Sequence, residues 1–129
     1  MKSYITHLEC TFCYRTHNAD KPQRLCEECG KVLYPRYDLL AAKRALDRNT
    51  FRDRPNNMWR YFEMMPVRDE RNVLTLGEGF TPIFKTERLG KHMGCKNLYI
   101  KDEGLNPTAS FKVRGLSAAV SKAKELGIT

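Results

Sequence analysis

The sequence lacks the segments that mark a membrane or a secreted protein. No apolar run approaches the roughly 20 residues that a helix needs to cross a bilayer. The N-terminus, MKSYITHLEC, has no apolar core followed by a small-residue cleavage site, which argues against a secretory signal. We therefore expect a cytoplasmic protein that does not contact membranes.

The sequence also contains no internal repeat, no low-complexity tract and no completed dinucleotide-binding fingerprint of the form G-x-G-x-x-G. The two glycines of L-G-E-G-F-T-P, residues 76–82, instead indicate a tight turn, because no helix follows at once. The 129 residues are 41% hydrophobic and 29% charged, which suits one modest globular domain or two small ones.

Four of the five cysteines are grouped near the N-terminus. Cys10, Cys13, Cys26 and Cys29 follow the pattern C-x2-C-x12-C-x2-C, in which two knuckles can close a tetrahedron of thiolates around zinc. A pair of disulfides is the alternative, but disulfides form in oxidising compartments, and the sequence shows no signal for export. We therefore predict a zinc site rather than two disulfides.

Four thiolates fill the coordination shell of zinc and leave no open position for a substrate. We therefore expect a structural ion in a zinc-ribbon-like module of residues 1–37, with a closing strand at residues 31–34 that Pro35 ends. His7 and His17 flank the first knuckle and are expected at the surface. Cys95 is expected to be a reduced thiol outside the cluster.

The net charge of +8 raises the question of nucleic-acid binding. Residues 1–37, however, contain six Lys and Arg against four Asp and Glu, and four thiolates with one Zn²⁺ would bring the module close to neutral. The excess positive charge lies downstream, without the interleaved aromatics that stack on bases. A nucleic-acid-binding zinc module is therefore the less favoured alternative, and it predicts salt-sensitive binding that a chelator abolishes.

Residues 38–72 read as a helical linker. Asp38 can cap a helix that runs through Leu46. The following MWRYFEMMPV, residues 58–67, is dense in large apolar side chains. A partner-binding face is one use of such a cluster, but packing against the body of the protein is the commoner one.

The last third of the chain predicts a strand, a turn and a helix. Residues 98–100 form a short β-favouring run, and apolar residues recur at helical spacing over residues 116–126. Pro107 forces a turn between them, and Thr108 or Ser110 can cap the helix. The helix keeps an apolar face that one short strand cannot cover, so we expect this part to be poorly folded or to depend on a partner.

The first turn of this helix carries Lys112 and Arg114, at the end where the helix dipole is positive and acidic residues are usual. Cations suit this place if an anion docks on the helix N-terminus or if the lysine is needed as a free amine. Positive surroundings favour the neutral form of an amine, which is the nucleophile that condenses with an aldehyde. A solvated surface lysine is the commoner alternative.

The segment KDEGLNPTASFKVRG, residues 101–115, resembles the cofactor-lysine motif K-x-E-x-x-N-P-T-G-S-F-K-x-R-G of fold-type II pyridoxal-phosphate enzymes. It is most similar to the threonine synthase branch, which the paired cysteines, W-R-Y at 59–61 and L-G-E-G-x-T-P at 76–82 also resemble in the same order. Ala109 and Val113 depart from the usual pattern. Ala109 matters more, since a side chain could crowd a turn that glycine would tolerate.

The resemblance implies an α/β fold, namely the N-terminal portion of a tryptophan synthase β-like body preceded by a small zinc ribbon. Residues 73–129 would be the start of the catalytic domain, truncated after the lysine helix. Lys112 would hold pyridoxal 5'-phosphate and move protons, and Ser110 and Asn106 would contact the cofactor. The implied reaction converts O-phosphohomoserine and water to threonine and phosphate.

The family places the phosphate loop, the ring-nitrogen partner and the substrate platform further along a much longer chain. We therefore expect an N-terminal fragment that is inactive alone and is completed by further sequence or by a complementing C-terminal chain. Two alternatives stay open within this resemblance. A threonine dehydratase or a cysteine synthase-like enzyme would share the lysine motif, and an inert fragment would take up no cofactor.

Overall fold

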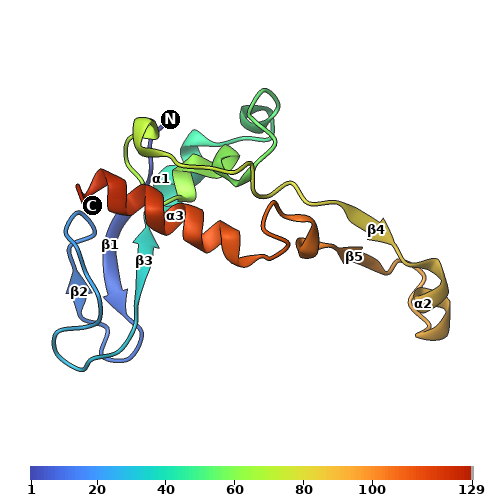
Figure 1. Cartoon of the computed structure of the whole chain (residues 1–129), viewed down its shortest axis with the longest axis horizontal. Coiled ribbons are helices and arrows are strands. Elements are labelled where there is room, and N and C mark those ends of the chain that lie inside the picture. Colours follow the sequence, from blue (N-terminus) through green and yellow to red (C-terminus); the bar gives the residue numbers. More distant parts are fainter. Residues whose placement is uncertain (129) are drawn as a thin grey trace.

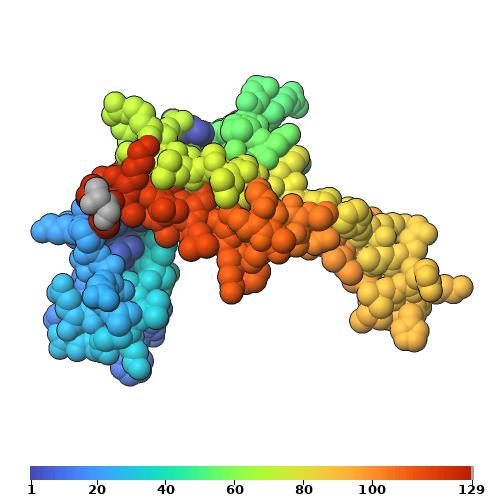
Figure 2. Space-filling view, viewed as in Figure 1, coloured from blue at the N-terminus to red at the C-terminus, as the bar shows by residue number. Residues whose placement is uncertain are grey.

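The computed structural model describes residues 1–128 and arranges them as three parts (Figure 1). A small antiparallel sheet forms one lobe, a set of short helices crossed by a long C-terminal helix forms the body, and a two-stranded hairpin forms an arm. Figure 2 shows the arm as an extension that stands away from the lobe. The chain is thus a small α/β structure, in agreement with the expected class at this coarse level.

The sheet of the lobe has the strand order β2-β1-β3. Its strands are β1 (Ile5–Cys10), β2 (Thr16–His17) and β3 (Leu33–Tyr37), and both pairings are antiparallel. The prediction that Pro35 ends the closing strand is wrong, because Pro35 lies within β3 opposite Leu8. β3 is an edge strand, where the missing N–H of proline costs no ladder hydrogen bond on the open side.

The segment after the lobe is helical. Its elements are α1 (Leu39–Ala45) and the 3₁₀ helices η1 (Asn49–Phe51), η2 (Met58–Met64) and η3 (Glu70–Asn72). The predicted cap is confirmed, since Oδ1 of Asp38 accepts a hydrogen bond from the backbone N–H of Ala41 at 2.8 Å.

The apolar core of the body is built from η2 and the residues that follow it. Met58, Trp59, Phe62 and Val67 form one buried cluster, and Phe62 and Val67 are fully shielded from solvent. Ala118 of the C-terminal helix packs against this cluster. The dense apolar segment therefore serves internal packing, as expected, and is not a free binding face.

The arm consists of β4 (Ile83–Lys85), α2 (Glu87–His92) and β5 (Tyr99–Lys101), with Ile83 paired to Lys101 in an antiparallel hairpin. The strand expected at residues 98–100 thus forms one residue later. Every residue of both strands is exposed. The hairpin therefore gains little from burial within the described residues.

After η4 (Glu103–Leu105), the C-terminal helix α3 (Lys112–Glu125) crosses the body. The residues that it buries are Val113, Ser117 and Ser121, which are spaced four apart and share one face. Leu116 and Val120 point elsewhere and are 63% and 52% exposed. The helix therefore packs through small side chains and leaves its larger apolar ones open.

Truncating the centre of the core gives the first test. Phe62→Ala should lower the free energy of unfolding by about 3–5 kcal/mol, because it leaves a cavity in a fully buried site. Urea denaturation measures the change. Phe84→Ala removes the same atoms from a half-exposed position in β4 and should cost much less. Equal losses in the two variants would contradict a core centred on Phe62.

Candidate functional site

The four predicted cysteines meet at the end of the lobe. The Sγ atoms of Cys10, Cys13, Cys26 and Cys29 all lie within 4.8 Å of one another, and Cys10 and Cys26 are buried. Neighbouring sulfurs are 3.4–3.6 Å apart, which is far longer than a disulfide of about 2.05 Å. A tetrahedron with Zn–S bonds of about 2.3 Å has sulfurs roughly 3.8 Å apart. The donor set therefore fits a tetrahedral metal ion.

The two knuckles have the same backbone design. The N–H of Cys10 donates to the carbonyl of Arg15 at 2.9 Å, and the N–H of Cys26 donates to that of Lys31 at 2.8 Å, five residues on in each case. The residue after the second cysteine of each knuckle has positive φ, 60° at Tyr14 and 67° at Gly30. Each C-x2-C turn thus directs its two thiols to the same point.

Backbone amides prepare one of these thiols for ionisation. Burial disfavours the thiolate of Cys10, but the N–H groups of Cys13 and Phe12 donate to its Sγ at 3.4 Å and lower its pKa to about 6. The pKa values of Cys13 and Cys29 are instead raised, by burial and by the neighbouring thiols.

One histidine departs from the expectation. His17 is buried rather than at the surface, because it pairs with Leu8 in the β1–β2 ladder and lies against the sheet. Its Nε2 has no hydrogen-bond partner among residues 1–128. His7 is half-buried. Neither histidine belongs to the cysteine group.

Lys112, Ser110 and Asn106 lie together on the turn between η4 and α3, as the motif predicts. Lys112 is the first residue of α3 and is exposed, and its backbone N–H donates to Oγ of Ser110 at 3.3 Å. The prediction that Thr108 or Ser110 caps the helix is wrong, because the N-cap is Phe111 and has no side-chain cap; Ser110 only accepts from the first amide of α3. Within residues 1–128, no hydrogen bond or ion pair engages the amine of Lys112, which leaves it available for chemistry.

The departure at Ala109 falls on a constrained position. Its φ of 53° lies in the left-handed region, which favours glycine and costs a residue with a Cβ roughly 1–2 kcal/mol. The N–H of Ala109 still donates to the carbonyl of Asn106 at 2.8 Å, so the turn closes despite the methyl group.

Asn106 is buried, and within the described residues its carboxamide is engaged by the protein itself. Its Oδ1 accepts from the N–H of Gly79 at 3.0 Å, and its Nδ2 donates to the carbonyl and to Oε2 of Glu103 at 2.8 and 3.1 Å. A Cβ at Gly79 would stand 2.7 Å from the backbone nitrogen of Met58, so this close approach requires glycine. Asn106 thus joins the L-G-E-G turn to the lysine motif.

Glu103 organises the charges beside the lysine turn. It receives two hydrogen bonds from Arg114, at 2.7 and 2.8 Å, and one from the hydroxyl of Thr81 at 2.6 Å. The Arg114 guanidinium, with help from Thr81 and Asn106, holds the pKa of Glu103 well below its usual range. Within residues 1–128, both hydrogen bonds of the Arg114 side chain thus go to Glu103.

Glu78 is the second buried carboxylate of this region and is fully shielded from solvent. It accepts from the indole N–H of Trp59 at 3.0 Å, the hydroxyl of Thr75 at 2.9 Å and the N–H of Leu76 at 2.8 Å. Burial alone would raise its pKa, but the hydrogen bonds that it accepts, including those from Leu76 and Thr75, lower it. Motif spacing does not reveal either carboxylate network, because the partners come from distant segments.

An open apolar cleft of about 390 Å³ runs along α3 beside the lysine turn. A second one, of about 540 Å³, adjoins the amine and includes Phe111, Lys112 and Leu116 in its wall. The residues that line the first cleft are Leu74, Thr75, Leu76, Thr108, Val113, Leu116, Ser117 and Val120. The outward apolar face of α3 thus lies next to the free amine.

Comparisons with known proteins agree with this layout. Residues 74–129 match the model of the family described as pyridoxal-phosphate dependent enzyme. Threonine synthase from Methanocaldococcus jannaschii is 41% identical over 119 residues, which are 92% of this chain. The chain is related to threonine synthases.

Two further threonine synthases are also similar to this chain. The enzyme from Methanosarcina acetivorans is 38% identical over 95% of this chain, and that from Halalkalibacterium halodurans is 55% identical over 52% of it. The chain spans only 29% of the length of each of the two archaeal relatives. No solved structure matches the chain. Among the described residues, no helix has the length and apolar character needed to cross a bilayer.

The Glu103 network makes a prediction about pH. Because its pKa is depressed in the folded state from an ordinary value of 4.5, Glu103 stabilises the fold above that value and loses this effect as the pH falls below it. Glu103→Gln should therefore be less stable than the wild type at pH 7, with a gap that narrows below about pH 4.5. Denaturation across pH measures it. Glu87→Gln, on an exposed acid of α2, should show no such gap.

Proposed function

We propose that this chain supplies the N-terminal part of a threonine synthase, which converts O-phosphohomoserine and water to threonine and phosphate with pyridoxal 5'-phosphate. The main support for the proposal is the amine of Lys112 at the start of α3, which has no hydrogen bond or ion pair within residues 1–128. The chain that carries this lysine is 41% identical to such an enzyme. The match of residues 74–129 to pyridoxal-phosphate dependent enzymes supports the choice of cofactor.

The residues of the turn fit the cofactor in different ways. The exposed amine of Lys112 would hold the cofactor through its aldehyde, and once substrate had displaced it, the amine would be the group that moves protons at the substrate carbons. Ser110 is the candidate for a polar contact beside it, since its hydroxyl is half-buried on the same turn. When bound, pyridoxal phosphate supplies an electron sink for a substrate carbanion.

Asn106 takes a narrower role in this proposal than the motif implies. Its carboxamide oxygen and nitrogen already bond to Gly79 and Glu103, so it serves the cofactor by holding the turn in place. A direct contact between Asn106 and the cofactor would use only the hydrogen-bonding capacity that these bonds leave on the carboxamide. Arg114 and Glu103 also hold the turn in place, because the two hydrogen bonds between them fix the first turn of α3.

The rest of the catalytic body covers the apolar face of α3 in this proposal. Leu116 and Val120 are large apolar side chains that are exposed to solvent. The curated relatives are more than three times as long as the matched region, which leaves ample sequence for the cover. We infer that further sequence, in the same polypeptide or a complementing chain, completes the site, and that residues 1–129 alone are inactive.

In this proposal the chain has three successive segments with different roles. Residues 1–37 form a zinc-ribbon-like module with a structural ion held by four thiolates, residues 38–72 pack the module against the body, and residues 73–129 begin the catalytic domain. The closed shell of four sulfurs leaves no ligand position for a substrate, so the ion has no catalytic role.

Removing the amine tests the cofactor proposal. In a polypeptide completed with the rest of a threonine synthase body, borohydride reduction followed by mass spectrometry should place pyridoxal phosphate on residue 112. Lys112→Ala should abolish this label and the release of phosphate from O-phosphohomoserine. Lys124→Ala, at the far end of α3, should keep both. A label on another lysine would sink the assignment, and turnover of serine or threonine instead would indicate a sister enzyme.

Metal analysis tests the zinc site. The chain should bind about one zinc ion, and Cys26→Ser should lower that content sharply, because it removes a buried ligand. Cys95→Ser, which changes the one cysteine outside the group, should have no effect. The site is refuted if both variants bind zinc as the wild type does.

A further inference from the structure

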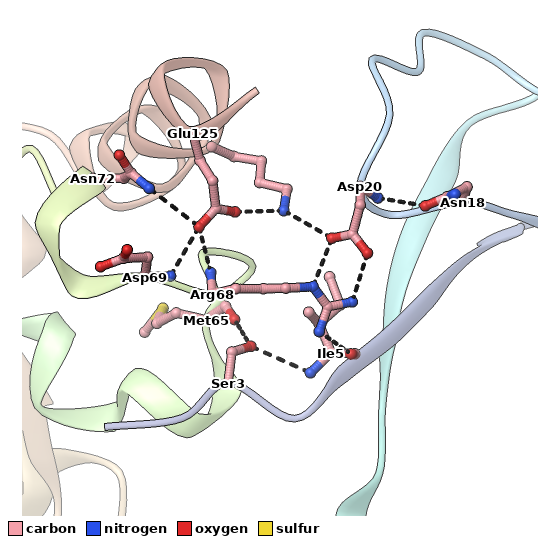
Figure 3. A network of polar contacts seen from close by, with 10 residues as sticks. Ser3, Ile5, Asn18, Asp20, Met65, Arg68, Asp69, Asn72 and Glu125 are labelled. Atoms are coloured by element: carbon pink, nitrogen blue, oxygen red, sulfur yellow. Dashed lines mark hydrogen bonds and ion pairs between the residues drawn. The ribbon is translucent and has the colours of Figure 1, made fainter. Parts of the chain in front are cut away.

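The cysteine lobe, residues 1–37, meets the C-terminal end of α3 through one carboxylate (Figure 3). Asp20 lies on the loop that connects Cys13 to Cys26. Its Oδ1 and Oδ2 accept from Nε and Nη2 of Arg68 at 2.6 and 3.0 Å, and the amine of Lys122 stands 3.5 Å from Oδ1. A loop set between two pairs of metal ligands is thereby joined to the last turns of α3.

The α3 side of this junction is more deeply buried. Glu125 accepts from the N–H groups of Arg68 and Asp69 at 2.7 and 2.9 Å and from the amine of Lys122 at 2.6 Å. The side chains of Lys122 and Glu125 are only 14% and 13% exposed. The last turns of α3 and the chain around Arg68 therefore form one polar unit, to which Asp20 adds one contact from the lobe.

Arg68 also ties this unit to the sheet. Its Nη1 donates to the carbonyl of Ile5 in β1 at 3.1 Å, while its other nitrogens hold Asp20. The guanidinium thus bridges two elements of the lobe. Two charged partners for Asp20 also lower its pKa, with Arg68 as the main cause.

The position of Asp20 depends on how its loop is closed. The twelve residues between Cys13 and Cys26 contain only the two-residue strand β2 as regular structure. Burial of Ala19 and pairing of β2 anchor part of the loop, but both of its ends are cysteine ligands. A metal ion that closes the loop removes most of its conformational freedom.

We propose that metal binding in the cysteine lobe positions the helix that carries Lys112, and that Asp20 is the positioning residue through which it acts. The inference rests on the metal site proposed above and gives that site a purpose beyond local folding. The cysteine group and Asp20 belong to the lobe, which contacts α3 near its C-terminal end, whereas Lys112 is the first residue of the same helix.

Hydrogen exchange on the full chain tests this, after zinc content has been measured. Removing zinc with a chelator should lower protection of the amides in the last two turns of α3 about tenfold, while amides of the Trp59–Phe62 core keep theirs. Asp20→Ala should show the low α3 protection even when saturated with zinc. Because coupling is reciprocal, its zinc affinity should fall by a comparable factor.

Glu27→Ala is the matched control. Glu27 is an exposed carboxylate of the same lobe, and among the described residues it has no hydrogen bond or ion pair, so its variant should behave as the wild type. Unchanged α3 protection on zinc removal, or an Asp20→Ala variant that matches the wild type, overturns the inference alone. An equal loss throughout the core overturns it too, since zinc would then act on global stability. Absence of zinc binding refutes the metal site and this inference together.

Discussion

The body of this chain depends on the burial of one carboxylate. Glu78 is shielded from solvent, and a buried charge is tolerated only when polar partners surround it. Its partners come from η2, through the indole of Trp59, and from its own turn, while Ser117 of α3 bonds to the same indole at 3.1 Å. Three segments far apart in the sequence must therefore be in place together.

This constraint explains why the sequence motifs can be specific to a family although most of their residues are not catalytic. In the lysine motif, Asn106, Glu103 and Arg114 use their polar groups on one another and on the L-G-E-G turn, where Gly79 fits a gap too small for a side chain. Within residues 1–128, the amine of Lys112 has no such partner. Most of the string thus encodes the scaffold that presents one amine, and similarity of the string measures shared architecture as well as shared chemistry.

The features that the sequence predicts correctly are those that residues close together in the sequence determine. The cysteine spacing leads to a group of four thiols because each C-x2-C turn is local, and the Asp38 cap and the turn before Lys112 are local as well. Predictions failed where distant partners decide. His17 is buried by its pairing with β1, and Pro35 stays in its strand because that strand is an edge.

The orientation of α3 is the clearest example of a choice that the sequence alone does not reveal. Its apolar periodicity is real, but the face that packs here carries Val113, Ser117 and Ser121, because the neighbouring surface offers polar acceptors such as the carbonyl of Leu74. Leu116 and Val120, which belong to the apolar pattern, do not pack on this surface and are exposed. A periodic pattern shows which residues share one face of a helix. The tertiary contacts decide which face packs against the rest of the protein.

The arm carries a consequence of its own. A lone pair of three-residue strands, exposed on both faces, has little cohesion in water, whereas the body is secured by its core and its carboxylates. Resistance to local opening should thus decline steadily from Phe62 outward to the tip at α2. Among residues 1–128, the outer backbone edges of β4 and β5 have no neighbouring strand, so the N–H and C=O groups along them are open to pairing.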